Sequence, residues 1–347
     1  MAYRAISIAH DPINYFLQES NQDQLLRVGD VVLRENKDPK EIFAHMIRLA
    51  TDSKWSHSAI VYLLSNPHKG FNNTFLIEAK TKGIHIASWR NEVVPFEKFT
   101  VGIKRPRMDW YQETPYEIAR HNPHNPEDVP GIGYLHHVRG IAMDQINGLY
   151  DKKTVYELTA LYAERVARQH LGAIPQIAAA AASAADLFKK WDEDETSATS
   201  ILRFVCSGLV QYSFFEALRR RIMNDLEIPE NRAAAMSNLS NMHRIIFRDD
   251  PGGIIPEYIH RVQSGKLDIR QQVPEDVLDL LKTVTPADFN NSPDLEWRYV
   301  ILRGAVWRIE EASTDYQAQS EGEQEVLNML EPEHRNVSLP KEFTRTE

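Results

Sequence analysis

Residues 203–212 read Arg-Phe-Val-Cys-Ser-Gly-Leu-Val-Gln-Tyr, and they contain Cys206, the only cysteine in the chain of 347 residues. A single thiol forms no internal disulfide and builds no thiolate metal cluster. The residues from Ile201 to Ile222 are apolar along one broad face, which predicts a helix with Cys206 near its beginning. Two roles stay open for Cys206 at this point: a small buried hydrophobic side chain or a nucleophile.

The composition is typical of a globular protein, with 42% hydrophobic and 26% charged residues. The net charge of −9 argues against broad nucleic-acid binding, which needs a surface that neutralises phosphates. No signal peptide and no membrane-spanning stretch is recognisable, so we expect a cytoplasmic protein. Secretion by a leaderless or specialised route stays open, and contact with a membrane surface is not favoured. The sequence carries no signal for an oligomeric state.

The first hundred residues predict a small, mostly antiparallel sheet with one helix. Capping residues predict that the helix begins at Asp38. β-branched and aromatic residues between turn signals predict five strands. These strands lie near residues 25–33, 55–64, 74–79, 83–88 and 100–104.

We expect one domain over residues 1–310. Within it, residues 109–200 are predicted to form an irregular and then helical insertion, because a stretch rich in Pro, Asn and His precedes an alanine-rich run. Residues 274–282 predict a further helix, and residues 297–307 predict a last strand that rejoins the N-terminal sheet. Residues 311–347 are polar and acidic, and we expect them to be a flexible tail.

Candidate partners for Cys206 lie in the predicted hairpin. A cysteine nucleophile needs a general base and a third group that orients this base. His57 opens the first strand of the hairpin, and Glu78 falls near the end of the second. Antiparallel pairing places these two positions side by side, where a carboxylate fixes the tautomer of an imidazole. Taken singly, both are also typical of ordinary surface residues, and His85 is the alternative orienting residue.

The order His57, Glu78, Cys206 is the reverse of the order in papain. It resembles the circularly permuted papain-like cysteine hydrolases of the NlpC-type superfamily. Six short segments carry the resemblance, and together they span most of residues 25–300. They are Gly29–Val32, Trp55–His57, Leu76–Ala79, Gly148–Asp151, Phe204–Ser207 and Thr285–Phe289.

The resemblance implies an α+β fold in which a small antiparallel sheet packs on the helix that carries the cysteine, here with a large helical insertion. It makes Cys206 the nucleophile at the helix N-terminus, His57 the base and Glu78 the orienting residue. The backbone N–H of Cys206 is then part of the oxyanion hole. Residues 201–205 contain no helix breaker, so the sequence alone does not place the helix start at Cys206.

These expectations describe a cysteine hydrolase that cleaves an amide bond through a thioester, on a peptide, isopeptide or peptidoglycan-type substrate. One alternative is a lipid acyl hydrolase or acyltransferase of the same fold, which acts on an acyl lipid. Another is a binding module that retains the fold and buries an unreactive Cys206. We expect no cofactor and no metal.

A second cluster of polar residues contains His121, His124, His136 and His137. Imidazoles at such spacings are candidate metal ligands. The neighbouring Asn-Pro steps are typical of turns, however, and they favour a polar loop.

Overall fold

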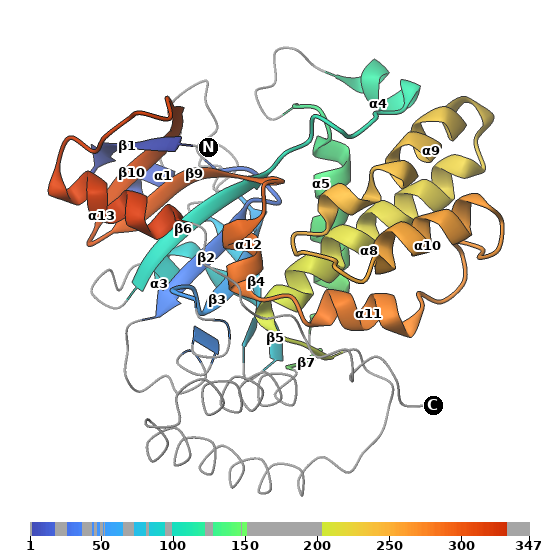
Figure 1. The fold of residues 1–347 in the computed structure, drawn as a ribbon, viewed down its shortest axis with the longest axis horizontal. Helices are drawn as coiled ribbons and strands as arrows, with labels where there is room; N and C mark the ends of the chain where they lie inside the picture. Colours follow the sequence, from blue (N-terminus) through green and yellow to red (C-terminus); the bar gives the residue numbers. More distant parts are fainter. Residues whose placement is uncertain are drawn as a thin grey trace, which may run out of the picture.

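The computed structural model of the chain describes residues 2–17, 26–36, 44, 47–48, 51, 53–64, 73–80, 83–93, 99–121, 128–146, 148–150 and 203–331 (Figure 1). Most of the helix predicted from Asp38 lies outside these residues, as does the greater part of the predicted insertion.

Eight strands form one sheet in which every neighbouring pair is antiparallel. Together with the helices of the described segments, this sheet confirms the mixed α+β class. In spatial order the strands are β1 (Ala2–Ala9), β10 (Ala305–Ala312), β9 (Leu295–Leu302), β6 (Phe99–Pro106), β2 (Val31–Asn36), β3 (His57–Leu63), β4 (Phe75–Lys80) and β5 (Gly83–Ser88).

The C-terminal end of the sheet differs from the prediction of one strand over residues 297–307. The chain reverses at Arg303 and Gly304, which have φ angles of 50° and 81°. Two consecutive residues with positive φ form a tight hairpin turn, so β9 and β10 are separate strands that pair with each other. β9 joins β6 as expected, and β10 pairs with β1, an edge strand that the sequence analysis missed.

Each face of the sheet has its own hydrophobic core. Leu33 and its neighbours on one face pack against helices, whereas Val32 faces the other side and lies in a second core with Phe16 and Trp89. This alternation is the two-residue period of a strand that is covered on both faces. Figure 1 shows the larger helices gathered to one side of the sheet. They are α5 (Ile132–Asp144), α8 (Cys206–Leu226), α9 (Arg232–Ser240), α10 (Ile254–Gln263) and α11 (Glu275–Lys282).

Two smaller helices cover the opposite face, and a pair of short strands lies beside the main sheet. The two helices are α1 (Pro12–Leu17), which carries Phe16, and α3 (Trp89–Val93). β7 (Leu149–Tyr150) pairs in parallel with β8 (Arg203–Phe204). Residues 151–202 therefore connect two adjacent strands, and β8 leads directly into α8.

Helix α5 lies within the predicted insertion, yet it belongs to the main core. Tyr134 and Val138 are fully buried, and the Tyr134 hydroxyl donates to the backbone oxygen of Phe214 on α8 at 2.8 Å. The helix begins at Ile132, inside the stretch that the sequence analysis read as irregular, because Pro and His residues around it concealed its apolar face. No helix in the described part of the chain is both long and apolar enough to cross a membrane.

Residues 311–331, which the sequence analysis assigned to a flexible tail, form regular elements of the fold. The strand β10 continues to Ala312, and α13 (Glu321–Leu330) buries Val326, Met329 and Leu330 in the main core. The spacing of these three residues is that of one helical face, which the acidic composition around them obscured. Residues 332–347 lie outside the described residues.

Two segments of the resemblance serve the architecture. Asp30 accepts two hydrogen bonds of 2.8 Å from the Arg105 guanidinium in the interior. Thr285 forms a capping box with Asp288 at the start of α12 (Pro286–Asn291). Lys104 on β6 then closes the far end of α12, where its ammonium group donates to the backbone oxygens of residues 289, 290 and 292 at 2.7, 2.8 and 3.2 Å.

Candidate active site

Helix α8 begins at Cys206. The preceding residue, Val205, is extended, with φ −74° and ψ 162°, and Leu209 N–H donates the first helical hydrogen bond to Val205 O at 3.0 Å. Val205 is extended because residues 203 and 204 form β8, which pairs with β7. The pairing of β8 with β7, and not a helix-breaking residue, therefore sets the start of α8. This pairing is a long-range contact that the local sequence does not show.

His57 is the first residue of β3, and the register of the sheet sets its neighbours. Arg34 on β2 pairs with His57, and Glu78 on β4 pairs with Ala59. Positions 57 and 59 lie on the same face of β3, so His57 and Glu78 share that face. Glu78 Oε2 lies 2.6 Å from His57 Nε2. This is the neighbourhood that the antiparallel hairpin predicted.

His57 and Cys206 lie close enough for each to shift the pKa of the other. Because Glu78 occupies Nε2, Nδ1 is the ring nitrogen that remains for the sulfur. Burial raises the pKa of Cys206, but the nearby His57, together with Ser58 and Ser207, outweighs burial and leaves this pKa below its usual value. Burial and Arg34 lower the pKa of His57, whereas Cys206 and Glu78 raise it, with a net increase. Both shifts favour a thiolate–imidazolium pair.

Glu78 lies in the interior, where its side chain is only 1% exposed. Burial alone raises the pKa of a carboxyl group. Hydrogen bonds from His57 and His85 and the charge of Lys80 nevertheless hold the pKa of Glu78 well below its usual range. The site therefore contains a fixed negative charge behind the His57 ring.

The beginning of α8 supplies backbone donors around the sulfur. In the first turn, the N–H groups of Cys206, Ser207 and Gly208 have no carbonyl partner within the helix. The backbone N–H of Ser58 lowers the pKa of Cys206, and the Ser58 hydroxyl donates to Ser207 Oγ at 3.2 Å. The first turn of α8 is thereby tied to the start of β3, where donors and the helix dipole favour negative charge.

His85 and Lys80 lie on the far side of Glu78. His85 Nε2 is 3.2 Å from Glu78 Oε1, and Lys80 Nζ is 2.6 Å from the same oxygen. Glu78 is thus the residue that lies next to His57. His85, the alternative orienting residue of the sequence analysis, lies on the other side of Glu78. Sequence reasoning missed Lys80, although its position two residues after Glu78 on a strand indicates the same face.

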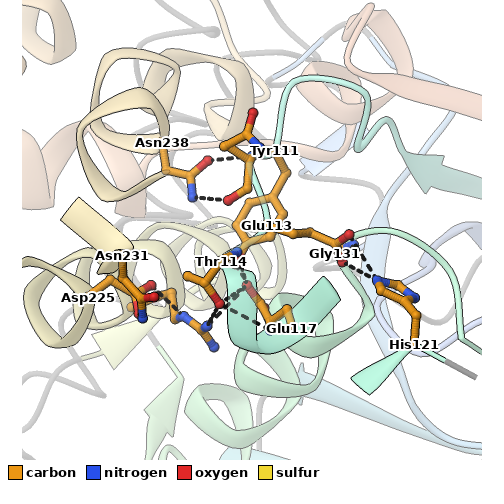
Figure 2. A network of polar contacts seen from close by, with 11 residues as sticks. Tyr111, Glu113, Thr114, Glu117, His121, Gly131, Asp225, Asn231 and Asn238 are labelled. Carbon is orange, nitrogen blue, oxygen red and sulfur yellow. Dashed lines mark hydrogen bonds and ion pairs between the residues drawn. The ribbon is translucent and has the colours of Figure 1, made fainter. Parts of the chain in front are cut away.

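The histidine-rich segment forms a separate polar network (Figure 2). His121 Nε2 lies 2.9 and 3.0 Å from the two carboxylate oxygens of Glu113, and its Nδ1 lies 3.0 Å from Asp128 Oδ1. Glu113 also accepts a hydrogen bond from Gly131 N–H at the start of α5. His124 lies outside the described residues, and within them no group of side chains has the arrangement of a metal site.

The same network anchors the short helix α4 (Pro115–Arg120) to the helices behind it. Glu117 caps α4 through Thr114 and pairs with Arg221 of α8 at 3.1 Å. Asn238 of α9 exchanges two hydrogen bonds with the backbone of Gln112, and Figure 2 shows it facing this segment. These contacts hold residues 111–121 against the helical layer.

Comparisons of the chain with protein-family models, with curated proteins and with solved structures returned no match. The functional assignment therefore depends on the geometry of Cys206, His57 and Glu78.

Proposed function

We propose that the protein is a cysteine hydrolase of permuted papain-like type, which cleaves an amide bond through a thioester acyl-enzyme. The observation that carries this proposal is the cluster of three residues at the N-terminus of α8, in which Glu78 Oε2 lies 2.6 Å from His57 Nε2 and His57 lowers the pKa of Cys206. A nucleophile, a base and an orienting group within hydrogen-bond reach of one another are the arrangement that nucleophilic catalysis requires.

The reaction follows from the positions of these groups. His57 holds the proton of Cys206, and the thiolate attacks the acyl carbon, so that a C–S bond forms and the carbonyl electrons move to oxygen. Backbone N–H groups at the start of α8, that of Cys206 among them, stabilise the oxyanion. The imidazolium then donates its proton to the leaving nitrogen as the C–N bond breaks.

Deacylation reverses the roles. His57 removes a proton from water, and the resulting hydroxide attacks the thioester carbon. Collapse of the second tetrahedral intermediate breaks the C–S bond, releases the acid and restores the thiolate–imidazolium pair. Throughout, Glu78 keeps a proton on Nε2 and leaves Nδ1 to exchange its proton with sulfur, substrate and water.

One observation favours the alternative of a non-catalytic binding module. Cys206 is only 1% exposed, and the His57 side chain is 13% exposed, so an acyl group reaches the sulfur only when neighbouring chain moves. Against this alternative stands the buried Glu78. A buried carboxylate is costly, and a purely structural thiol needs neither an imidazole nor a charged partner behind it.

Alkylation by iodoacetamide, followed by intact mass from about pH 5 to about pH 9, separates the two functions. For a hydrolase we expect single labelling that persists well below the usual pKa of a thiol. Labelling should disappear in Cys206→Ser and become that of an ordinary thiol in His57→Ala. His243→Ala, which changes an exposed histidine, is the matched control. An unreactive Cys206, or an ordinary thiol titration in the unmodified protein, supports the binding module.

Acyl probes then distinguish the bond that is attacked. p-Nitrophenyl acetate should acetylate Cys206, with a mass increase of one acetyl group that is absent in Cys206→Ser. Peptidyl amides and peptidoglycan fragments test amide hydrolysis, and phosphatidylcholine vesicles test acyl transfer from lipid. Turnover of the vesicles without turnover of any amide would replace the amidase with a lipid acyl hydrolase or acyltransferase.

A further inference from the structure

The carboxylate of Glu78 contacts three basic side chains, one from each of the strands β3, β4 and β5. Its oxygen Oε2 lies 2.6 Å from His57 Nε2, whereas Oε1 lies 2.6 Å from Lys80 Nζ and 3.2 Å from His85 Nε2. Oε2 thus contacts the candidate base His57, whereas Oε1 contacts Lys80 and His85 on the side of Glu78 away from His57. The proposed mechanism uses only the first of these contacts.

The sheet register produces this convergence. Glu78 on β4 pairs with His85 on β5, and Lys80 follows Glu78 by two residues and shares its face. Gly83, the first residue of β5, has a φ of 113°, and a Cβ there would lie 2.9 Å from the backbone oxygen of Gly148. Ile84 N–H donates to that same oxygen at 3.1 Å. These contacts, together with the pairing of β5 with β4, place His85 opposite Glu78.

Both ring nitrogens of His85 face acceptors. Nε2 faces Glu78 Oε1, and Nδ1 lies 3.3 Å from the backbone oxygen of Gly83. The Glu78 carboxylate, 3.2 Å from Nε2, raises the pKa of His85, while partial burial and the charge of Lys80 oppose the increase. The carboxylate therefore favours the imidazolium form of His85. Glu78 and Lys80 are the charged groups that face His85 from β4.

We propose that His85 and Lys80 are positioning residues that hold the outer oxygen of Glu78, and that the protonation of His85 regulates the reactivity of Cys206 through Glu78 and His57. This inference rests on the proposed function. When His85 loses its proton, one of its ring nitrogens can no longer donate, although both nitrogens face oxygen acceptors, Glu78 Oε1 and Gly83 O. The negative charge of Glu78 is then less balanced on its outer side, and it acts more strongly on His57.

The inference predicts a direction for the pH profile. Loss of a nearby positive charge makes it easier for the remaining groups to bind protons. In His85→Gln, which keeps a neutral donor, both limbs of the profile for alkylation of Cys206 should move to higher pH. A Glu78 that is less firmly held should also lower the rate of acyl transfer about tenfold. Lys80→Met should change both quantities in the same direction, and His85→Lys, which restores a cation, should recover the profile in part.

The test combines alkylation profiles with NMR titration of the ring nitrogens of His57 in the full chain. His121→Gln is the matched control, because His121 also lies between carboxylates but contacts Glu113 and Asp128 instead of the site. In the unmodified protein, which needs no substitution to fold, the His57 signal should show a second inflection at the pH where His85 titrates.

The outcomes for the two proposals differ. Profiles of His85→Gln and Lys80→Met that superimpose on that of the unmodified protein, together with a single inflection for His57, would overturn the positioning role. The hydrolase would remain, provided that His57→Ala still abolishes the activation of Cys206. An unmodified protein whose Cys206 titrates as an ordinary thiol would instead remove the proposed function itself.

Discussion

Gly208 and Lys282 approach each other so closely that a Cβ on Gly208 would lie 2.7 Å from the Lys282 carbonyl oxygen. Gly208 is in the first turn of α8, two residues after Cys206, and Lys282 is the last residue of α11. The absence of a side chain at this position lets the end of one helix meet the start of the other. The location of the candidate nucleophile therefore depends on a glycine that carries no chemistry.

Gly208→Ala should displace the first turn of α8. Because the atom in the way belongs to the backbone, we expect a loss of about 1–3 kcal/mol in the free energy of unfolding. Alkylation of Cys206 should also become slower, since the thiol moves relative to His57. Gly140→Ala in α5 is the control, because a Cβ there meets nothing within 4 Å. The free energy of unfolding of Gly140→Ala should rise by about 0.5–1 kcal/mol. Equal changes in Gly208→Ala and Gly140→Ala would contradict the packing argument.

Glu78→Gln should remove the orienting charge while it keeps the shape of the side chain. An amide NH₂ that faces Nε2 favours the tautomer with a proton on Nδ1, which then cannot accept the proton of Cys206. We expect the rate of acyl transfer to p-nitrophenyl acetate to fall about 100-fold or more. Glu310→Gln breaks the exposed pair with Arg4 and should leave the rate unchanged. A rate for Glu78→Gln within twofold of the unmodified protein, which is about the scatter of such measurements, would show that His57 needs no charged partner.

His121 should stabilise the protein more at low pH than at high pH. The hydrogen bond to Glu113 raises the pKa of His121. A histidine whose pKa is higher in the folded state contributes stability that is fully present below its unfolded pKa of about 6.5 and is lost as the pH rises through the folded pKa. The difference in melting temperature between the unmodified protein and His121→Gln should therefore be largest near pH 5.5 and shrink toward about pH 8.5.

A double variant provides the control for His121. Once Glu113→Gln is present, the further change His121→Gln should have a smaller pH-dependent effect, because the main cause of the raised pKa has gone. A difference in melting temperature that stays constant with pH in the single variant would show that His121 acts through packing alone.

Lys104→Met should destabilise the protein strongly. The substitution keeps the apolar length of the side chain but leaves three backbone oxygens at the end of α12 without their donor. Unpaired buried acceptors cost about 1–3 kcal/mol each, so we expect a loss of about 3 kcal/mol or more in urea unfolding. Lys266→Met, at an exposed lysine, should change stability by less than about 0.5 kcal/mol. Similar losses in both variants would indicate that the three contacts contribute little.

The strands and the neighbourhood of His57 and Glu78 were accessible from local patterns. Residues 83–88 form β5 as predicted, because a β-rich run between turn residues has few alternatives. The two strands β3 and β4 are consecutive in the chain and are separated by turn-forming residues, so the proximity of His57 to Glu78 needed no information from elsewhere in the chain. The hairpin of β9 and β10 was missed because Arg303, which is not a glycine, adopts a positive φ.

Taken alone, the sequence determined which chemistry the chain carries: one thiol, with a histidine and a glutamate on neighbouring strands in a fixed order. The tertiary structure alone decided that Cys206 lies beside the His57–Glu78 pair. The pairing of β8 with β7 starts α8 at Cys206, and the close approach of α11 to Gly208 holds that turn in place. The contacts of His85 and Lys80 with Glu78 likewise follow from register. The pairing of β8 with β7 and the approach of α11 to Gly208 join residues far apart in the chain, and their free energy depends on packing that no local pattern encodes.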